Sequence, residues 1–376
     1  MSKVKALLTA AVLGAWCVAA LQAQETTNGP TLRQAAKGKF LIGAAIRPDQ
    51  VSGAIGDLIA AQFDSVTAEN AMKPADLQPR PGEFNFGPAD AIVDFAQKHG
   101  ITVIGHNLCW HNQTPAWFFQ NADGTPLPRE KALANLKAHI TAVVTHYKGK
   151  IRGWDVVNEA LSDNDKDYLR DTPARKAIGD DYIVQVFKLA HEADPDIELY
   201  YNDYNIDFGE KMKKAVRLIG ELKAAGCRVD GVGSQSHWQL NWPSAQDIET
   251  GITTLAGTGV KVHVTELDID TLPRKGQTAN ITDVEKASGG TEQDPYVGGL
   301  PNDVQEKLAA RYATVFGIFK KHQDKVARVT LWGVDDGMSW LNGFPVRGRT
   351  NHPLLFDRKL QPKPAYASVV KALKAE

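Results

Sequence analysis

The chain alternates short β-forming runs with longer helical stretches, and this alternation limits its fold more than any other feature. Eight apolar or β-branched runs have the length of strands, and stretches with the period of an amphipathic helix separate them. The strand-like runs are Phe40–Ile46, Phe63–Ala68, Thr102–Leu108, Ile151–Val157, Ile197–Tyr201, Gly231–Ser236, Val260–Leu267 and Val326–Trp332. The expected helices are Ala89–His99, Glu130–Tyr147, Ile178–Ala193, Glu210–Ala225, Ala245–Ala256 and Val304–Lys321.

Strands that alternate with helices form parallel sheets, and eight such units predict the closed form of this architecture. An open, doubly wound sheet is the alternative, but no Gly-x-Gly-x-x-Gly turn follows the first strand-like run. No low-complexity linker divides the chain into a second module. The sequence therefore predicts an α/β protein with a single (β/α)8 TIM barrel, in which the chemistry is expected where the strands end.

The first 24 residues have the layout of a secretory signal. Two lysines precede an apolar run at 6–21, and small residues near Ala23 offer a cleavage point. A membrane anchor is the alternative, because the run approaches the length of a bilayer span. Gly14 and the polar stretch after the run favour cleavage. We therefore expect a signal peptide at 1–24, one domain at 25–376, no membrane attachment after cleavage, and a secreted protein that is either extracellular or periplasmic.

The charges are almost balanced, with 43 Lys and Arg against 44 Asp and Glu. Nucleic acid or an anionic membrane as the main partner would require a surplus of basic residues, so neither is expected. Removal of the signal leaves Cys109 and Cys227. An exported protein can oxidise such a pair, and the sequence leaves this question open. We expect a monomer.

Polar and aromatic residues gather at the carboxyl ends of the strand-like runs. One such residue is often a solvated loop residue or part of the core, but here the same end is occupied in seven runs. That concentration predicts an active site at this end of the barrel. The residues are Glu69, Asn70, His106, Trp110, His111, Asn158, Glu159, Asn202, Asp203, Tyr204, Gln235, His237, Glu266, Asp268 and Trp332.

Two glutamates are the most informative members of this group. Glu159 and Glu266 end the fourth and seventh runs, which stand on opposite sides of an eight-membered ring. Two carboxyl groups that face each other across a barrel mouth can hold a glycosidic bond, one as general acid and the other acting on the anomeric carbon. We expect burial and the charge of Glu266 to raise the pKa of Glu159 above about 4.3, so that it keeps its proton near neutrality.

Strand parity places an imidazole beside the second of these glutamates. Residues two apart face the same side of a strand. Gln235 and His237 therefore project together, and so do Glu266 and Asp268 on the neighbouring run. A histidine between two carboxylates can orient one of them and keep it ionised. By the same parity His263 faces the other way, and we expect it to be a packing residue.

Histidines beside carboxylates are also found in metal sites, but the spacing argues against one. His106 and His111 are five residues apart and fall on opposite faces of a strand, and no His-x-His or His-Glu-x-x-His motif occurs. Tryptophan faces suit the stacking of sugar rings, and carboxamides suit hydroxyl groups that both donate and accept. These groups predict a sugar-lined cleft without a metal. They are Trp110, Trp332, Trp340, Asn70, Asn158 and Gln235.

At these residues the chain resembles the glycoside hydrolase family 10 endo-β-1,4-xylanases. The resemblance runs from about residue 43 to residue 366 and rests on seven blocks. One such block would be weak, but seven in order are specific. The blocks are TAENAMK (67–73), GHNLCWHNQTP (105–115), WDVVNEA (154–160), NDYN (202–205), GSQSHW (233–238), VTELDI (264–269) and LWGV (331–334).

The resemblance implies a (β/α)8 barrel that needs no cofactor and hydrolyses internal β-1,4-xylosidic bonds of xylan and xylo-oligosaccharides, with retention through a covalent glycosyl-enzyme. It implies that Glu159 is the acid/base and Glu266 the nucleophile. Asn158 would bind the 2-hydroxyl of the sugar under attack, and His237 with Asp268 would support the nucleophile. The implied glycone subsites are lined by Glu69, Asn70, Lys73, His106, Trp110, Gln235, Trp332 and Trp340, and Tyr204 is implied as an aromatic platform on the leaving-group side.

Two other functions stay open at this point. One is an endo-β-1,4-glucanase of the same mechanism, and the other is a non-catalytic xylan-binding relative. In the family, Lys73 and Trp340 crowd the place where a hexose carries its extra hydroxymethyl group, which favours xylan, and the presence of both glutamates favours catalysis. The long stretch at 270–300 is expected to form a wall on the leaving-group side of the cleft.

Overall fold

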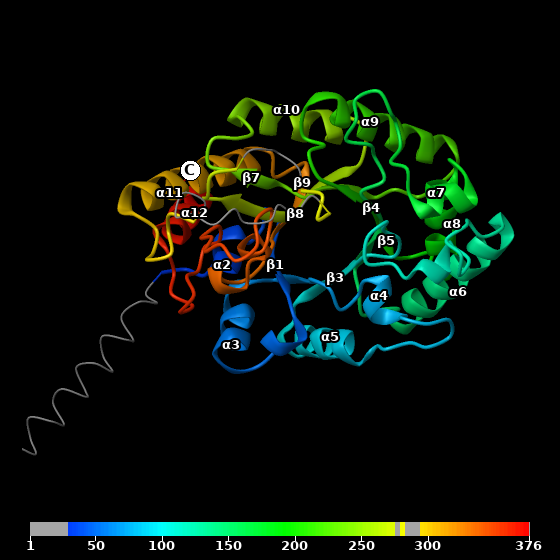
Figure 1. The fold of residues 1–376 in the computed structure, drawn as a ribbon. Helices are drawn as coiled ribbons and strands as arrows, with labels where there is room; N and C mark the ends of the chain where they lie inside the picture. The colour runs from blue at the N-terminus through cyan, green and yellow to red at the C-terminus, as the bar shows by residue number, and fades with distance from the viewer. Residues whose placement is uncertain (1–28, 275–278, 283–293, 376) are drawn as a thin grey trace, which may run out of the picture.

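The computed structural model describes residues 29–274, 279–282 and 294–375. The signal peptide expected at 1–24 lies outside the described residues, and so do residues 275–278 and 283–293 of the wall expected at 270–300. Figure 1 shows the strands gathered in the middle of the molecule, with helices around them.

The strands form a closed ring in which every pair of neighbours is parallel. The order is β1–β2–β3–β4–β5–β6–β8–β9, and β9 pairs with β1 to close the ring. The short strand β7 follows β6 along the chain and pairs with the outer end of β8, so that β6 and β7 together fill the sixth barrel position. The prediction of a single (β/α)8 TIM barrel is confirmed. The strands are β1 Leu41–Ile46, β2 Ser65–Ala68, β3 Thr102–His106, β4 Gly153–Asn158, β5 Glu198–Asp203, β6 Gly231–Ser234, β7 His237–Gln239, β8 Lys261–Asp270 and β9 Val326–Leu331.

Helices follow the strands and cover the outside of the ring (Figure 1). Local signals fix several ends: Gly100 closes one helix at a φ of 63°, and Ser244 opens another through a capping box with Asp247. The helices are α2 Leu32–Ala36, α3 Gly53–Gln62, α4 Pro74–Leu77, α5 Gly87–His99, α6 Arg129–His146, α7 Pro173–Ile178, α8 Tyr182–Ala193, α9 Gly209–Ala224, α10 Ala245–Ala256, α11 Asn302–Lys321 and α12 Pro364–Lys374. Short 3₁₀ turns lie at Pro48–Gln50, Ala116–Phe118, Asp336–Met338 and Trp340–Asn342.

The predicted helix Ile178–Ala193 is wrong in its extent. The chain forms two helices there, α7 and α8, because Gly179 takes a φ of 110° and ends the first. The helix α3 between the first two strands was not predicted from periodicity. Its two glycines, Gly53 and Gly56, weaken the apolar pattern on which such a prediction depends.

The barrel interior is filled by large polar side chains that glycines accommodate. A Cβ atom on Gly153 would lie 2.3 Å from the Tyr200 hydroxyl, and one on Gly231 would lie 2.5 Å from His263 Nε2. The His263 ring lies 4.5 Å from that of Tyr200, and its Nδ1 accepts a bond of 3.4 Å from Arg328. Since β5 and β8 are not neighbours in the ring, these contacts cross the inside of the barrel.

The parity prediction for His263 was therefore wrong: the side chain is packed, but it faces inward. In the pairing of β8 with β9, Val264 lies opposite Val329 and Leu267 lies opposite Leu331, so β8 holds one extra residue over this interval. Such a bulge reverses the alternation of faces. As a result His263 and Glu266 both face the interior, although they are three positions apart in the strand.

The outer core lies between the strands and the helices. Trp154 of β4 is fully buried and packs near Tyr147 at the end of α6, as expected from its place within a strand. A Cβ atom on Gly105 of the adjacent β3 would lie 2.2 Å from the Trp154 ring. Over the part of the chain that the structure describes, no helix has both the length and the apolar character of a bilayer span.

Candidate active site

Closure of the barrel brings Glu159 and Glu266 to the same mouth. Glu159 follows β4 directly, Glu266 lies in β8, and both side chains are buried. Three carboxamides join them in one hydrogen-bonded chain. Gln235 Nε2 donates to Glu159 Oε1 at 2.9 Å and to Asn158 Oδ1 at 3.2 Å. Asn202 Nδ2 donates to the same Asn158 oxygen at 2.9 Å and to Glu266 Oε1 at 2.8 Å.

Glu159 is held so that its protonated form is favoured. Its Oε2 also accepts a bond of 2.9 Å from the Trp110 indole. Burial, followed by the charge of Asp203 and then that of Glu266, raises the pKa of Glu159 to about 7, against the opposing effect of the Gln235 and Trp110 bonds. The predicted rise is therefore found, but Asp203 exceeds Glu266 as a cause. Below a pH of about 7 the protonated form of Glu159 therefore predominates.

Glu266 has the opposite preference. His237 Nε2 lies 3.3 Å from Glu266 Oε2, and its Nδ1 lies 3.1 Å from Asp268 Oδ2, as parity predicted. Burial lowers the pKa of His237, but Asp268 and Glu266 outweigh it and raise the value to about 9. Burial also raises the pKa of Glu266, and the His237 bond with the charge of His106 outweighs that effect and lowers it. The site thus pairs a carboxylate with a carboxylic acid.

A buried lysine lies on one side of the two glutamates. Lys73 Nζ donates to Asn70 Oδ1 at 3.0 Å and to Gln113 Oε1 at 2.8 Å, and it lies 4.8 Å from the centre of the Trp110 ring. Burial lowers the pKa of Lys73, opposed by the charges of Glu266, Glu69 and Glu159. Glu69 lies at the end of the adjacent β2, and burial raises its pKa. Four of the predicted glycone residues are therefore gathered here.

Of the remaining glycone residues, Gln235 binds Glu159, and Trp340, Trp332 and His106 lie on the side of His237. The ring centres of Trp340 and Trp332 lie 4.7 and 6.4 Å from that of His237. Trp340 Nε1 also donates to Asp268 Oδ2 at 2.7 Å. His106 meets the edge of Trp332, and its Nδ1 pairs with Asp155 at 2.9 Å. Aromatic faces and the nucleophile's support therefore share one wall.

Tyr204 lies on the other side of Glu159. Its hydroxyl accepts a bond of 2.9 Å from Arg170 and donates to Asp163. Lys211 Nζ lies 3.5 Å from the centre of its ring. Tyr204 is 1% exposed, so most of its ring is covered by these partners. Its predicted use as a sugar platform stays a prediction.

The structure adds partners to the predicted site: Gln113 and Asp155 were not among the strand-end residues, and Asn202 and Asp203 were among them without an assigned role. Asn202 binds Glu266, Gln113 binds Lys73, Asp155 binds His106, and Asp203 acts on Glu159. Asn202, Gln113 and Asp155 stand within quoted blocks of the resemblance, and Asn202 and Asp203 stand at a strand end. The strand-end position of Asn202 and Asp203 was therefore a signal, but the partners of all four residues are distant in the chain and cannot be read from local sequence.

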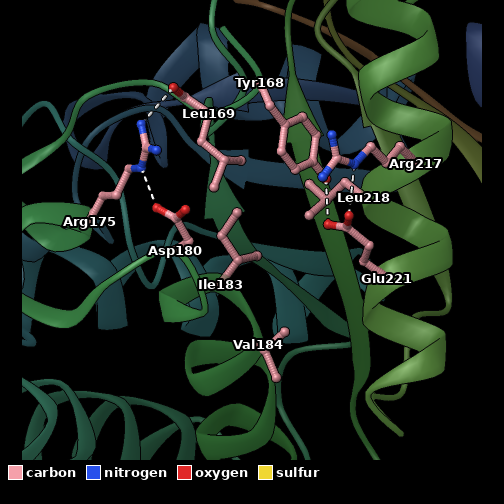
Figure 2. Close-up of a pocket in the computed structure, with 9 residues that line it drawn as sticks. All are labelled: Tyr168, Leu169, Arg175, Asp180, Ile183, Val184, Arg217, Leu218 and Glu221. Atoms are coloured by element: carbon pink, nitrogen blue, oxygen red, sulfur yellow. Dashed lines mark hydrogen bonds and ion pairs between the residues drawn. The ribbon is translucent and has the colours of Figure 1, made fainter.

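One cavity lies apart from the glutamates. The cavity in Figure 2 has a volume of about 390 Å³ and is lined by residues of α7, α8 and α9, the segment before α7 and the turn between α7 and α8, none of which is a predicted site residue. Cys109 and Cys227 are both free thiols. Within residues 29–274, 279–282 and 294–375, no group of three or more His, Cys, Asp or Glu side chains is arranged to hold a metal ion.

Comparison with known proteins supports the same assignment. Endo-1,4-beta-xylanase A of Xylanibacter ruminicola is 43% identical over 347 residues, which cover 92% of this chain and 94% of the relative. The crystal structure of a xylanase from Paenibacillus barcinonensis, complexed with a conduramine derivative, matches with a TM-score of 0.83 at 41% identity, covering 92% of this chain and 99% of that one. An intracellular xylanase from Thermoanaerobacterium saccharolyticum, solved as a mutant with xylotetraose, matches with a TM-score of 0.78 at 38% identity, covering 91% and 98% of the two chains.

The family model for Glycosyl hydrolase family 10 matches residues 31–372. This match spans nearly all of the described residues and includes both glutamates and every predicted subsite residue. The resemblance inferred from the seven sequence blocks is confirmed, and the chain belongs to glycosyl hydrolase family 10.

Proposed function

We propose that this protein is an endo-1,4-β-xylanase that cleaves internal xylosidic bonds with retention, by double displacement. The observation that carries the proposal is the buried chain of carboxamides that joins Glu159, whose pKa is raised, to Glu266, whose pKa is lowered. Retaining glycoside hydrolysis needs these two protonation states side by side. The three relatives described above are all named xylanases, which supports xylan as the substrate.

In the first step, Glu266 attacks the anomeric carbon while Glu159 transfers its proton to the departing glycosidic oxygen. The C–O bond to the leaving sugar breaks, and an ester bond to Glu266 forms. In the second step, Glu159 is a carboxylate and removes a proton from water, whose oxygen attacks the same carbon. This step breaks the ester, restores the original configuration and returns both glutamates to their starting states.

Neighbouring groups keep the two roles apart. His237, protonated between Asp268 and Glu266, keeps the nucleophile ionised and fixes its orientation. Asn158 lies between the glutamates in the carboxamide chain, where it can bind the 2-hydroxyl of the sugar under attack. A hydrogen bond that strengthens as positive charge develops on the sugar favours the transition state over the substrate.

The same mechanism on a glucan is the second candidate. Lys73 and Trp340 are the residues expected to crowd a hexose hydroxymethyl group; Lys73 donates to Asn70, and Trp340 donates to Asp268. We expect high activity on xylan and little on carboxymethylcellulose. Higher activity on the glucan would overturn the choice of sugar. Glu266→Ala is the control: activity retained by this variant would contradict the mechanism, and xylan binding without any turnover by the native chain would favour the non-catalytic alternative.

We also propose that residues 1–24 direct export and are then removed, which leaves a monomer without a membrane attachment. Export is supported by the apolar run at 6–21, which follows two lysines and precedes the expected cleavage point near Ala23. Family membership does not decide the compartment, because one similar xylanase is described as intracellular. Sequencing of the mature N-terminus from the culture medium and from the periplasm tests the proposal. A retained Met1 in the cytoplasm would contradict it.

A further inference from the structure

Glu159 has an unusual backbone conformation. Its φ is 57°, in the left-handed region that residues with a Cβ atom rarely adopt. Such a conformation persists only where the surroundings impose it. Its own N–H donates to Asn202 O at 2.8 Å, and its carbonyl accepts a bond of 3.1 Å from Arg170 Nε. Both polar backbone groups of Glu159 are therefore fixed.

Two buried side chains of β5 hold the residues that follow. The Tyr201 hydroxyl accepts from the backbone N–H groups of Ala160 at 3.1 Å and of Leu161 at 3.2 Å. The same hydroxyl donates to Asp203 Oδ2 at 2.6 Å, and that oxygen also accepts from Leu161 N at 3.3 Å. Tyr201 and Asp203 are both 0% exposed. We name this pair the β5 clamp.

Charged partners anchor the β5 clamp and the loop after β4. Lys211 of α9 pairs with Asp203 at 2.9 Å and with Asp163 of the loop at 2.7 Å, and Arg170 pairs with Asp163 at 2.9 Å. The outer side of this loop is tied as well, as Figure 2 shows. There Arg175 donates to the backbone oxygen of Leu169 at 3.1 Å, and Tyr168 donates to Glu221 at 2.8 Å.

We infer that Tyr201 and Asp203 are positioning residues for the acid/base: through the backbone of residues 160 and 161 they aim the carboxyl group of Glu159 at the leaving oxygen. A buried hydrogen bond to a charged group is strong enough to oppose the cost of the left-handed conformation. Neither side chain needs to touch substrate for this role. The inference rests on the proposed function, because it assumes that Glu159 is the proton donor.

The charge of Asp203 has a second consequence. It disfavours ionisation of Glu159 and so supports the raised pKa of that group. Other groups also act on this carboxyl, and they come from several elements. Those that face Glu159 or its backbone are Glu266 of β8, Lys73 at the start of α4, Tyr204 after β5, and Arg170 of the loop after β4.

The test compares two substrates that differ in their need for an acid. Hydrolysis of xylan requires protonation of the leaving oxygen. The dinitrophenolate of 2,4-dinitrophenyl β-xylobioside, in contrast, leaves without being protonated. For Tyr201→Phe and Asp203→Asn we expect kcat/KM on xylan to fall about ten- to a hundredfold, with little change on the dinitrophenyl substrate. For Asp203→Asn we also expect the alkaline limb of the xylan profile to move to lower pH.

Tyr200→Phe is the matched control. It removes another buried tyrosine hydroxyl from the same strand, but this hydroxyl bonds to Glu198. We expect both substrates to be hydrolysed as by the native enzyme. Equal losses on both substrates in the Tyr201 and Asp203 variants would show a general structural role and overturn the inference.

Glu159→Gln distinguishes a failure of the proposed function from a failure of the inference about Tyr201 and Asp203. Because Glu159 also activates water in the second step, the comparison uses kcat/KM, which reports the first step. If this variant loses kcat/KM on xylan and keeps kcat/KM on the dinitrophenyl substrate, the proposed function stands, and the clamp variants then decide the inference alone. If Glu159→Gln loses kcat/KM equally on both substrates, the acid/base assignment itself is wrong.

Discussion

Replacing Glu159 by glutamine should stabilise the folded protein at neutral and alkaline pH. The carboxyl group is buried, with 3% of the residue exposed, and its pKa is raised to about 7 from an ordinary value of 4.5. Between pH 4.5 and about 7 the carboxyl group has lost its proton in the unfolded chain but retains it in the folded chain. The free energy of unfolding of the native protein therefore falls as pH rises through this window. Glutamine has nearly the same shape and no charge to bury.

The size of the effect follows from the two pKa values. At about 1.4 kcal/mol per pKa unit, a rise from 4.5 to about 7 corresponds to roughly 3 kcal/mol. The difference in unfolding free energy between Glu159→Gln and the native protein should grow by this amount between pH 4.5 and 7, and then stay constant. Any loss from the Gln235 and Trp110 hydrogen bonds adds an offset that does not depend on pH in this range.

Urea unfolding of both proteins at several pH values measures this difference. Glu266→Gln is a matched control with the opposite sign, because the pKa of Glu266 is lowered in the folded state. The stability that Glu266 contributes is present above its unfolded pKa and is lost as pH falls through its folded pKa. The loss of unfolding free energy caused by Glu266→Gln, relative to the native protein, should therefore become smaller at acid pH. A Glu159→Gln difference that is the same at pH 4.5 and 8 would refute the reasoning.

Three further predictions concern activity and packing. The alkaline limb of the kcat/KM profile on xylan should fall near pH 7, because loss of the Glu159 proton stops protonation of the leaving oxygen; a limb above pH 9 would contradict this. Asn202→Ala should lower kcat/KM on xylan about ten- to a hundredfold with the fold intact by circular dichroism, since Glu266 loses a bond of 2.8 Å. In thermal unfolding, Gly105→Ala should lower the free energy of unfolding by about 1–3 kcal/mol, because its Cβ would lie 2.2 Å from a buried indole. Gly220→Ala, which has open space in α9, should raise that free energy by about 0.5–1 kcal/mol.

The closed barrel could be predicted because strands and helices differ in period and because the chain repeats the alternation eight times. The pairing of His237 with Asp268 also followed from parity, and the same ring contacts Glu266. Parity failed at His263, because a bulge before Leu267 changes which face each residue of β8 presents. A bulge depends on the pairing with β9, so the sequence of β8 alone does not contain it.

The two central glutamates could be predicted because strand order in a barrel fixes which ends meet. The groups that tune them could not. Asp203 raises the pKa of Glu159 from the neighbouring strand, and Lys211 reaches Asp203 from α9. These contacts depend on side-chain direction and on the course of the loop after β4. Burial was expected to act on Glu159, but the relative effect of Asp203 and Glu266 depends on distances that only the folded chain defines.

The central claim is that Glu266 forms a bond to the sugar while Glu159 serves as its acid and base. Incubation with 2,4-dinitrophenyl 2-deoxy-2-fluoro-β-xylobioside, followed by peptide mass spectrometry, tests it directly, because the fluorine slows release of the glycosyl-enzyme. The account predicts one covalent sugar per chain, on the peptide that contains Glu266 and not on the one that contains Glu159. Hydrolysis without any labelled peptide, or a label on another residue, would contradict it.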